Sequence, residues 1–182
     1  MPLNVLLAVS LTLFALLSTP GANAASPSMD SIFAEQERNA LVLKVEAALS
    51  LAQAEQGIIP QWAADEIAAR ASLDYLPADA LDEEFSRVRH RMVALLNVWG
   101  RSLGEAREYA HFGATTVDIY DTVLVLQLIQ AANALEAQLL GIEAVLMQRA
   151  LEHKATPMIG RTLGQHALPI TFGKKLSTWL GE

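Results

Sequence analysis

The sequence predicts an all-α protein from three observations. Hydrophobic residues make up 52% of the 182 residues, enough for a sizeable core, whereas aromatic residues make up only 6%. Glycine and proline are sparse, with 10 and 7 copies, which disfavours a sandwich or barrel rich in turns. Apolar residues also recur at helical spacing along most of the chain. The length suits one domain, or one domain and part of another.

The first 28 residues predict an apolar leader ahead of the folded part. No charged side chain occurs before Asp30, and Val5–Leu17 is an apolar run of signal-peptide length. The small residues at 22–24, Ala-Asn-Ala, form a cleavage pattern, but the usual basic residues are missing. Three alternatives stay open: an export signal, an uncleaved anchor, or a start codon set too early, with translation beginning near Met29.

An N-terminal helical domain is expected over residues 29–117, with helices at about 30–57, 61–71 and 82–103. Asp30 or Ser31 can cap the first helix, Gly57 can end it, and Pro60 breaks the chain after it. The polar segment before the third helix is expected to be a connection.

Residues 118–182 are expected to begin a central helical bundle that is incomplete in this chain. The longest periodic segment, 118–154, has an apolar stripe of Leu124, Leu128, Leu135, Leu139, Ile142 and Leu146. About thirty helical residues at about 1.5 Å each give a rod of about 45 Å, which the shorter helices cannot cover. We therefore expect neighbours of similar length, supplied by self-association. The Gly- and Pro-rich segment 156–173 is expected to break the chain before a last helix.

Charge and composition exclude several classes of function. The chain has 13 Lys and Arg residues against 20 Asp and Glu residues, a net charge of −7. This acidic balance lacks the excess of positive charge that is typical of proteins that bind nucleic acid. Cysteine is absent, which excludes disulfides, thiolate zinc sites and cysteine nucleophiles. No spacing of His, Asp and Glu resembles a metal site, and no cofactor is implied.

Two polar clusters interrupt the apolar pattern. The first is YAHFGATTVDIYDT, Tyr109–Thr122, in which Thr115, Thr116 and Asp118 stand before the long helix. These residues could simply cap that helix, or they could form a wall of an active site. The second is GRTLGQHALPITFG, residues 160–173.

Three motifs, in order, resemble the fumarase/aspartase superfamily. The first cluster is similar to its His-x-Gly-Ala-Thr-Ser-x-Asp-x-x-Asp-Thr region, and the second to its Gly-Arg-Thr-x-x-Gln-x-Ala-x-Pro-x-Thr-Phe-Gly loop. VEAALSLAQAEQGIIP, residues 45–60, resembles the N-terminal helix and turn of the branch that holds adenylosuccinate lyase and 3-carboxy-cis,cis-muconate cycloisomerase. The match runs from about Ser31 to the end of the chain.

The resemblance implies an all-helical homotetramer, cytoplasmic unless the leader exports it, that performs β-elimination or lactone cycloisomerisation on a small carboxylate substrate. It implies that each active site draws residues from three subunits. It implies substrate-binding roles for His111, Thr115, Thr116, Thr162 and Gln165, with Asp118 and Arg161 as structural residues at the site. Thr116 stands where the family often has Ser, which keeps the hydroxyl and adds a methyl group.

The resemblance leaves the catalytic residues open. His90 corresponds to a histidine in a helix of adenylosuccinate lyase that reaches its active site, but an exposed histidine in a basic turn is an equal alternative. Leu163 replaces the histidine of a Thr-His pair, the proposed acid of adenylosuccinate lyase. Leucine cannot donate a proton, which favours the cycloisomerase-like reading over adenylosuccinate lyase.

The superfamily's Gly-Ser-Ser-x-Met-Pro-x-Lys-x-Asn loop, whose serine is the proposed base, does not occur in the 182 residues. We therefore expect the N-terminal part of such an enzyme, inactive alone. A non-catalytic helical module that kept the scaffold is the other possibility.

Overall fold

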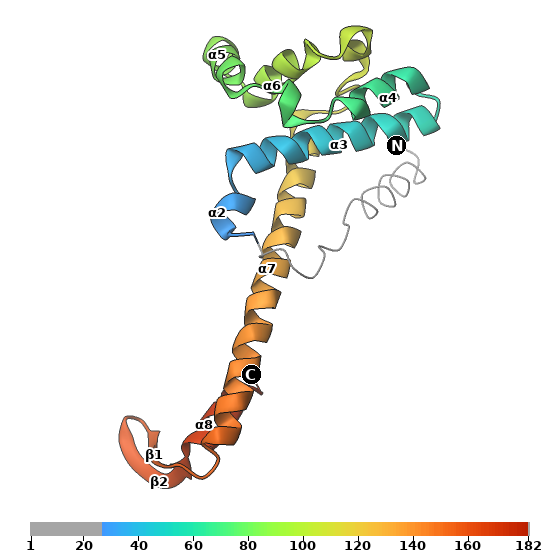
Figure 1. Cartoon of the computed structure of the whole chain (residues 1–182). Helices are drawn as coiled ribbons and strands as arrows, with labels where there is room; N and C mark the ends of the chain where they lie inside the picture. The colour runs from blue at the N-terminus through green and yellow to red at the C-terminus, as the bar shows by residue number, and fades with distance from the viewer. Residues whose placement is uncertain (1–26, 182) are drawn as a thin grey trace. The chain divides into compact units, whose positions relative to one another are not determined.

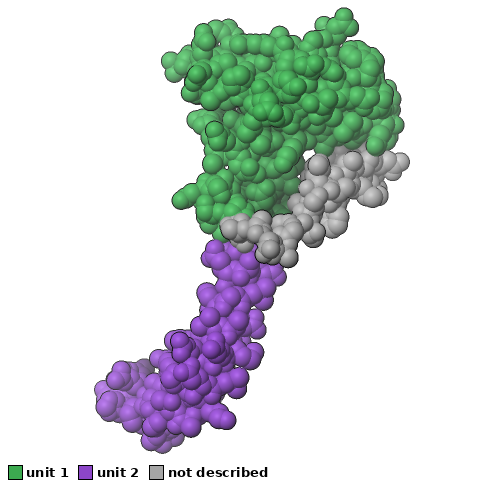
Figure 2. Space-filling model, viewed as in Figure 1, with its two compact units in different colours: residues 1–131 green, residues 132–182 purple. Residues whose placement is uncertain are grey.

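The computed structural model describes residues 27–181 and is helical with one β-hairpin (Figure 1). The all-α class is confirmed. The described chain forms two compact units, unit 1 up to Ala131 and unit 2 from Ala132 (Figure 2). The predicted leader, an export signal, an anchor or an early start, covers residues 1–28, and all but its last two residues lie outside the described range. The division into domains at residue 117 stays a prediction.

Unit 1 is a small helical domain in which α3 lies beside α4 and α5 beside α6 (Figure 1). Its elements before the long helix are α2 (Met29–Ile32), α3 (Glu35–Glu55), α4 (Gln61–Ala69), η1 (Leu73–Tyr75), α5 (Ala78–Val88), α6 (Arg91–Gly100) and η2 (Gly104–Tyr109). The core combines aliphatic side chains of α3, α4 and α6 with Trp99. The indole of Trp99 is fully buried, and its Nε1 donates to the Arg70 carbonyl at 2.7 Å, so its polar atom is satisfied.

The first predicted helix is two helices. Neither Asp30 nor Ser31 is the cap: Ser28 caps α2, accepting from the Ser31 N–H at 3.1 Å. Ala34 is extended, with φ −61° and ψ 149°, and it separates α2 from α3. The predicted stop is confirmed, since α3 ends at Glu55 and Gly57 follows with φ +68°, a conformation that glycine adopts without steric cost.

The prediction of a single helix over residues 82–103 was wrong, because two helices occupy this range. Arg89 adopts φ 55°, in the left-handed region, and ends α5, while His90 is extended and begins α6. The break carries no glycine or proline. A buried carboxylate fixes it instead, because Glu84 of α5 accepts a hydrogen bond from Asn97 of α6 at 2.7 Å and also pairs with Arg87 and Arg101.

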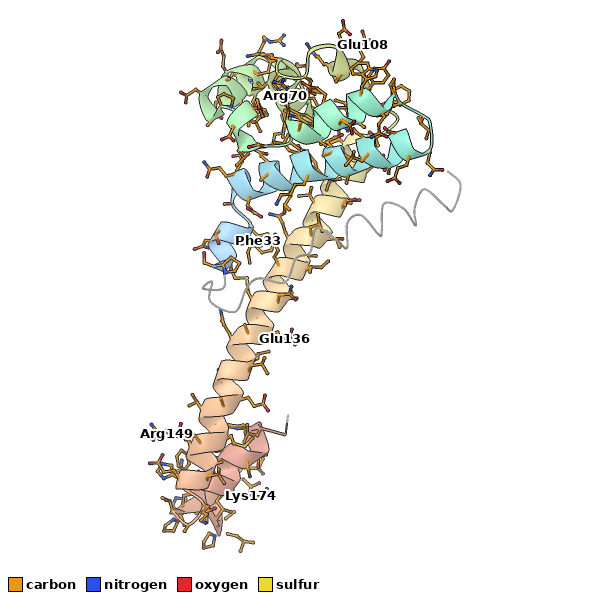
Figure 3. All side chains as sticks on the ribbon, turned by 45° about the vertical axis from the view of Figure 1, so that its right-hand side comes forward. Phe33, Arg70, Glu108, Glu136, Arg149 and Lys174 are labelled. Carbon is orange, nitrogen blue, oxygen red and sulfur yellow. The ribbon has the colours of Figure 1, made fainter. Side chains whose placement is uncertain are left out.

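The long helix α7, Thr116–Glu152, has 37 residues, about 55 Å at 1.5 Å per residue. Its first turns join the core of unit 1 through Ile119 and Val123, and Gln127 donates to the Ile32 carbonyl at 2.7 Å. Around Glu136 its side chains project on all sides of the ribbon (Figure 3). Within the described residues it is also the one helix that could cross a membrane by length and composition alone, but core helices of soluble bundles meet the same criterion.

Unit 2 contains a β-hairpin where the sequence predicted an irregular break. Strands β1 (Pro157–Thr162) and β2 (Gln165–Thr171) pair antiparallel, and α8 (Phe172–Trp179) follows directly. Leu163 and Gly164 form the turn with φ 50° and 74°, the positive values of a type I′ turn. The strand register shifts at Gly160, where an added Cβ would lie 2.8 Å from the Leu168 carbonyl oxygen.

Helix α8 packs closely on the end of α7. The Gly173 N–H donates to the His153 carbonyl at 2.9 Å. A Cβ at Gly173 would lie 2.5 Å from the Ala150 carbonyl oxygen, so only glycine fits this approach.

Candidate active site

The predicted site residues of unit 1 lie on one short segment between η2 and α7. His111 has φ 60° and Gly113 has φ 69°, so two backbone positions within three residues are left-handed. The Ala114 N–H donates to the His111 carbonyl at 3.4 Å, which closes a turn and keeps the histidine close to the start of α7. A left-handed conformation at a non-glycine residue costs free energy and persists where the surroundings enforce it.

Two buried side chains of α3 enforce that conformation. Glu46, 0% exposed, places Oε1 2.6 Å from His111 Nδ1. About two helical turns further along α3, Gln53 donates from Nε2 to the Phe112 carbonyl at 2.7 Å. Helix α3 therefore holds the side chain of His111 and the backbone of Phe112.

Burial sets the electrostatics of this contact. Removal from water raises the pKa of Glu46, and the neighbouring His111 offsets part of that rise. The carboxyl group and the imidazole therefore meet across a short contact in a low-dielectric setting.

The start of α7 is ordered by Asp118. Its Oδ2 accepts from the Thr115 N–H at 2.9 Å, the contact made by the acid of a capping box three residues into a helix. Thr115 is exposed and Thr116 half-buried. Since Asp118 caps this turn, the threonine hydroxyls can serve a ligand without loss of that bond, and the positive end of a 37-residue helix lies beside them.

The other predicted binding residues lie in unit 2, at the tip of the hairpin. Thr162 and Gln165 are partners across the turn, and Arg161 pairs with His166 in the strand register. All three predicted residues are exposed. Leu163, at the tip, is 97% exposed. The hairpin is thus a protruding element with polar groups on either side of its turn.

His90 is the N-cap of α6, not a residue in the middle of a helix as predicted. It is exposed, and its Nδ1 accepts from the Val93 N–H at 3.3 Å. A cleft of about 170 Å³ lies close by in sequence, lined by Glu35, Asn39, Leu81, Asp82, Phe85, Arg91, Ala94 and Leu95. It contains none of the predicted site residues, and Glu35 already pairs with Arg91. His90 stays a predicted catalytic candidate.

Among residues 27–181, no group of three or more His, Asp and Glu side chains is placed to hold a metal ion.

Sequence reasoning missed the buried polar residues of α3: Glu46, Ser50 and Gln53. The sequence does contain a pattern that could have identified them. Glu46, Ser50 and Gln53 are four and three positions apart, so they fall on one helix face, and apolar residues occupy most of the remaining circumference. Polar residues at that spacing in an otherwise buried helix indicate a buried polar contact.

Comparison with known proteins places these clusters in a family. A family model described as "Lyase" matches residues 22–182. Adenylosuccinate lyase from Methanocaldococcus jannaschii is 39% identical over 86% of this chain and 34% of its own length. N-acetyl-S-(2-succino)cysteine lyase from Dickeya dadantii is 41% identical, over 89% of this chain and 36% of its own length. The crystal structure of 3-carboxy-cis,cis-muconate lactonizing enzyme from Pseudomonas putida superposes with a TM-score of 0.76 at 37% identity, covering 86% of this chain and 37% of that one. The chain thus spans about a third of the length of these relatives.

Proposed function

Because this chain belongs to the lyase family of the fumarase/aspartase superfamily, we propose that its segment His111–Asp118 binds a carboxylate of a di- or tricarboxylate substrate. The reaction is β-elimination or lactone cycloisomerisation, with this chain as the N-terminal part of the enzyme. The observation that carries this assignment is the segment with left-handed residues at His111 and Gly113, which Glu46 and Gln53 contact and which ends at the start of α7.

The proposed reaction requires hydrogen-bond donors at the start of α7. Removal of a proton next to a carboxylate gives an aci-carboxylate with an extra negative charge, and fixed donors must receive that charge as it develops. The hydroxyls of Thr115 and Thr116, together with the backbone N–H groups of the first turn of α7, are suitable donors. Thr162 and Gln165 would supply further polar contacts to substrate in the assembled protein, and Arg161 would support their hairpin.

No residue of this chain is assigned as the general base. The superfamily's serine loop is not among the 182 residues, and His90 stays a candidate. We therefore propose that turnover requires residues besides those of this chain.

A cycloisomerase-like reaction is favoured over an amine-releasing one by Leu163, which cannot protonate a leaving amine. The alternative, a C–N lyase of the adenylosuccinate lyase type, is supported by the 39% identical relative. A non-catalytic helical module that kept the scaffold would bind no carboxylate, and this separates it from both enzymes.

Binding at the start of α7 is tested by titrating fumarate into the ¹⁵N-labelled full chain and following amide signals by NMR. We expect the signals of Thr115 and Thr116 to shift, with acetate giving a weaker response. Thr116→Val keeps the shape of the side chain and removes one hydroxyl. Loss of one hydrogen bond, about 1–1.5 kcal/mol, should raise the Kd for fumarate about tenfold.

The matched control is Thr122→Val. The Thr122 hydroxyl donates to the Asp118 carbonyl within α7 and is not expected to contact a ligand, so fumarate affinity should be unchanged. Equal affinities of the wild type and the Thr116→Val variant, or no shift at either threonine with fumarate, would contradict the proposed function.

A further inference from the structure

We propose that Glu46 is a positioning residue for His111: it holds the ring through Nδ1, so that Nε2 is the nitrogen offered as a hydrogen-bond donor to an anionic ligand at the start of α7. The ligand in this statement rests on the proposed function, whereas the pairing and the state of the ring do not.

The geometry of the pair carries the first step. Glu46 comes from α3 and His111 from the segment 65 residues later, and their Oε1–Nδ1 distance is 2.6 Å. The carboxyl group is 0% exposed, while the imidazole side chain is 17% exposed. The Nδ1 edge of the ring therefore faces a buried carboxyl group, while the side chain as a whole keeps some exposure to solvent. A buried partner on one ring nitrogen is the usual means of fixing the orientation and tautomer of a working histidine.

Gln53 supports the same segment from the same face of α3. It holds the Phe112 carbonyl at 2.7 Å, and a Cβ on Gly113 would lie 3.9 Å from its Nε2. The segment thus cannot rotate as a unit to release His111 without also breaking the hydrogen bond from the buried Gln53 side chain. Glu46 and Gln53, seven positions apart, lie two helical turns apart on one side of α3.

The proton count of the pair fixes the role of Nε2. An electrically neutral pair holds two protons on its carboxyl and imidazole groups. If one of them lies between Oε1 and Nδ1, bonded to either atom, the other is on Nε2. A neutral pair with the proton on Oε2 instead would leave Nε2 bare. Oε2 is buried with no hydrogen-bond partner among residues 27–181, so a proton there would be an unsatisfied buried donor.

A pair with a net negative charge is the other state in which Nε2 would be an acceptor, since a cationic pair keeps a proton on Nε2. Burial disfavours it, since desolvation raises the pKa of Glu46. His111 is the only charged or titratable side chain that acts on this carboxyl among the described residues. The neutral pair, with a donor at Nε2, is therefore the state that the surroundings stabilise. A donor there suits an anionic oxygen.

The state of the ring is measured on the full chain without ligand. Two-bond ¹H–¹⁵N correlation spectra at pH 7 report which nitrogen of each histidine carries a proton. We expect His111 to show a protonated Nε2 and an Nδ1 shared with a partner, unlike the exposed His166, which should show exchanging tautomers. An unprotonated Nε2 on His111 would overturn the inference without recourse to any variant.

Two variants test whether Glu46 causes this state. Glu46→Ala should give His111 the averaged pattern of His166. Glu46→Gln keeps the size of the side chain but has no ionisable proton to share, so it should give a mixture of tautomers and guards against an alanine variant that fails to fold. Glu55→Gln, the same change at an exposed position of α3, is the matched control and should leave His111 unaltered. A wild-type pattern in Glu46→Gln would overturn the role of Glu46.

The ligand is tested separately with fumarate as the probe. Glu46→Gln should weaken fumarate binding at least fivefold and remove the shift of the His111 Nε2 signal, while Glu55→Gln should bind as the wild type does. If fumarate shifts neither Thr115 nor Thr116 in the wild type, the proposed function fails even where the ring state is as expected. If fumarate binds and Glu46→Gln leaves its affinity unchanged, the positioning role fails and the proposed function stands.

Discussion

At the scale of a single residue, Glu84 shows how a buried charge sets the local path of the chain. It is 6% exposed, and hydrogen bonds from Arg87 and Asn97 lower its pKa below the ordinary 4.5, against the opposing effect of burial. A carboxyl whose folded pKa is below its unfolded pKa contributes stability above the unfolded value and loses it as the pH falls through the folded value. Part of the stability of unit 1 should therefore disappear below about pH 4.5.

Glu84→Gln tests this contribution. At pH 7 the variant should have a Tm lower by a few degrees, because the ion pairs with Arg87 and Arg101 are gone. The difference from the wild type should shrink as the pH falls below 4.5. Thermal unfolding followed by circular dichroism at pH 7, 5, 4 and 3 gives both quantities. Glu83→Gln, at the exposed neighbouring position, is the control, and a pH-independent difference for Glu84→Gln would contradict the assignment.

At the scale of elements, the turn of the hairpin is under strain at Leu163. The residue has φ 50° and is 97% exposed, so it bears the cost of a left-handed conformation, about 1–2 kcal/mol, with no packing to offset it. Asn-Gly is the favoured pair for a type I′ turn. Leu163→Asn should therefore stabilise the hairpin by about 1 kcal/mol.

Amide hydrogen exchange of β1 and β2 measures this effect, as slower exchange across the Thr162–Gln165 pair. Leu168→Asn replaces another exposed leucine, on β2 and away from the turn, and it should give no gain. Unchanged or faster exchange in Leu163→Asn would show that the turn is not strained.

The elements that the sequence predicted well are those with local causes. The end of α3 before Gly57 follows from glycine's freedom at φ +68°, and the extent of α7 from apolar periodicity. The break at Arg89 has no local cause, because contacts of Glu84 with α6 impose it. The hairpin had a local cause that was misread. Leu163-Gly164 lies between two stretches of strand length, whereas the glycine and proline content of 156–173 predicts irregular structure.

The residues of the candidate site also fall into those that the sequence predicted and those that depend on contacts distant in sequence. Motif resemblance pointed to His111, Thr115 and Thr116, whose positions at the start of α7 follow from their order in the chain. The contact of Glu46 with that segment joins residues 65 positions apart, and the contact of Gln53 joins residues 59 positions apart. Such pairings depend on how α3 packs in the fold, so one sequence alone does not predict them.

At the scale of the whole molecule, α7 carries a long exposed apolar surface. Large hydrophobic side chains are exposed along most of the helix. Each is about half exposed or more: Val117, Leu124, Val125, Leu128, Leu135, Leu139, Leu140, Ile142, Val145, Met147 and Leu151. Soluble monomers rarely expose contiguous apolar patches above a few hundred Å². We propose that copies of the chain associate through α7 as helices of a bundle do, with apolar side chains interdigitating along their length.

Sedimentation of the purified chain checks this proposal. The mass should exceed the 19.7 kDa of one chain, and the double change Leu135→Gln and Leu139→Gln should shift the distribution toward the monomer. Each of these leucines is more than half exposed in the single chain, so their replacement removes interface area without opening a cavity in the fold. Leu73→Gln, the same change on η1 and away from α7, should leave the association unaltered. A monodisperse wild-type monomer would mean that α7 needs no covering copy, and an equal loss of association in Leu73→Gln would place the interface elsewhere.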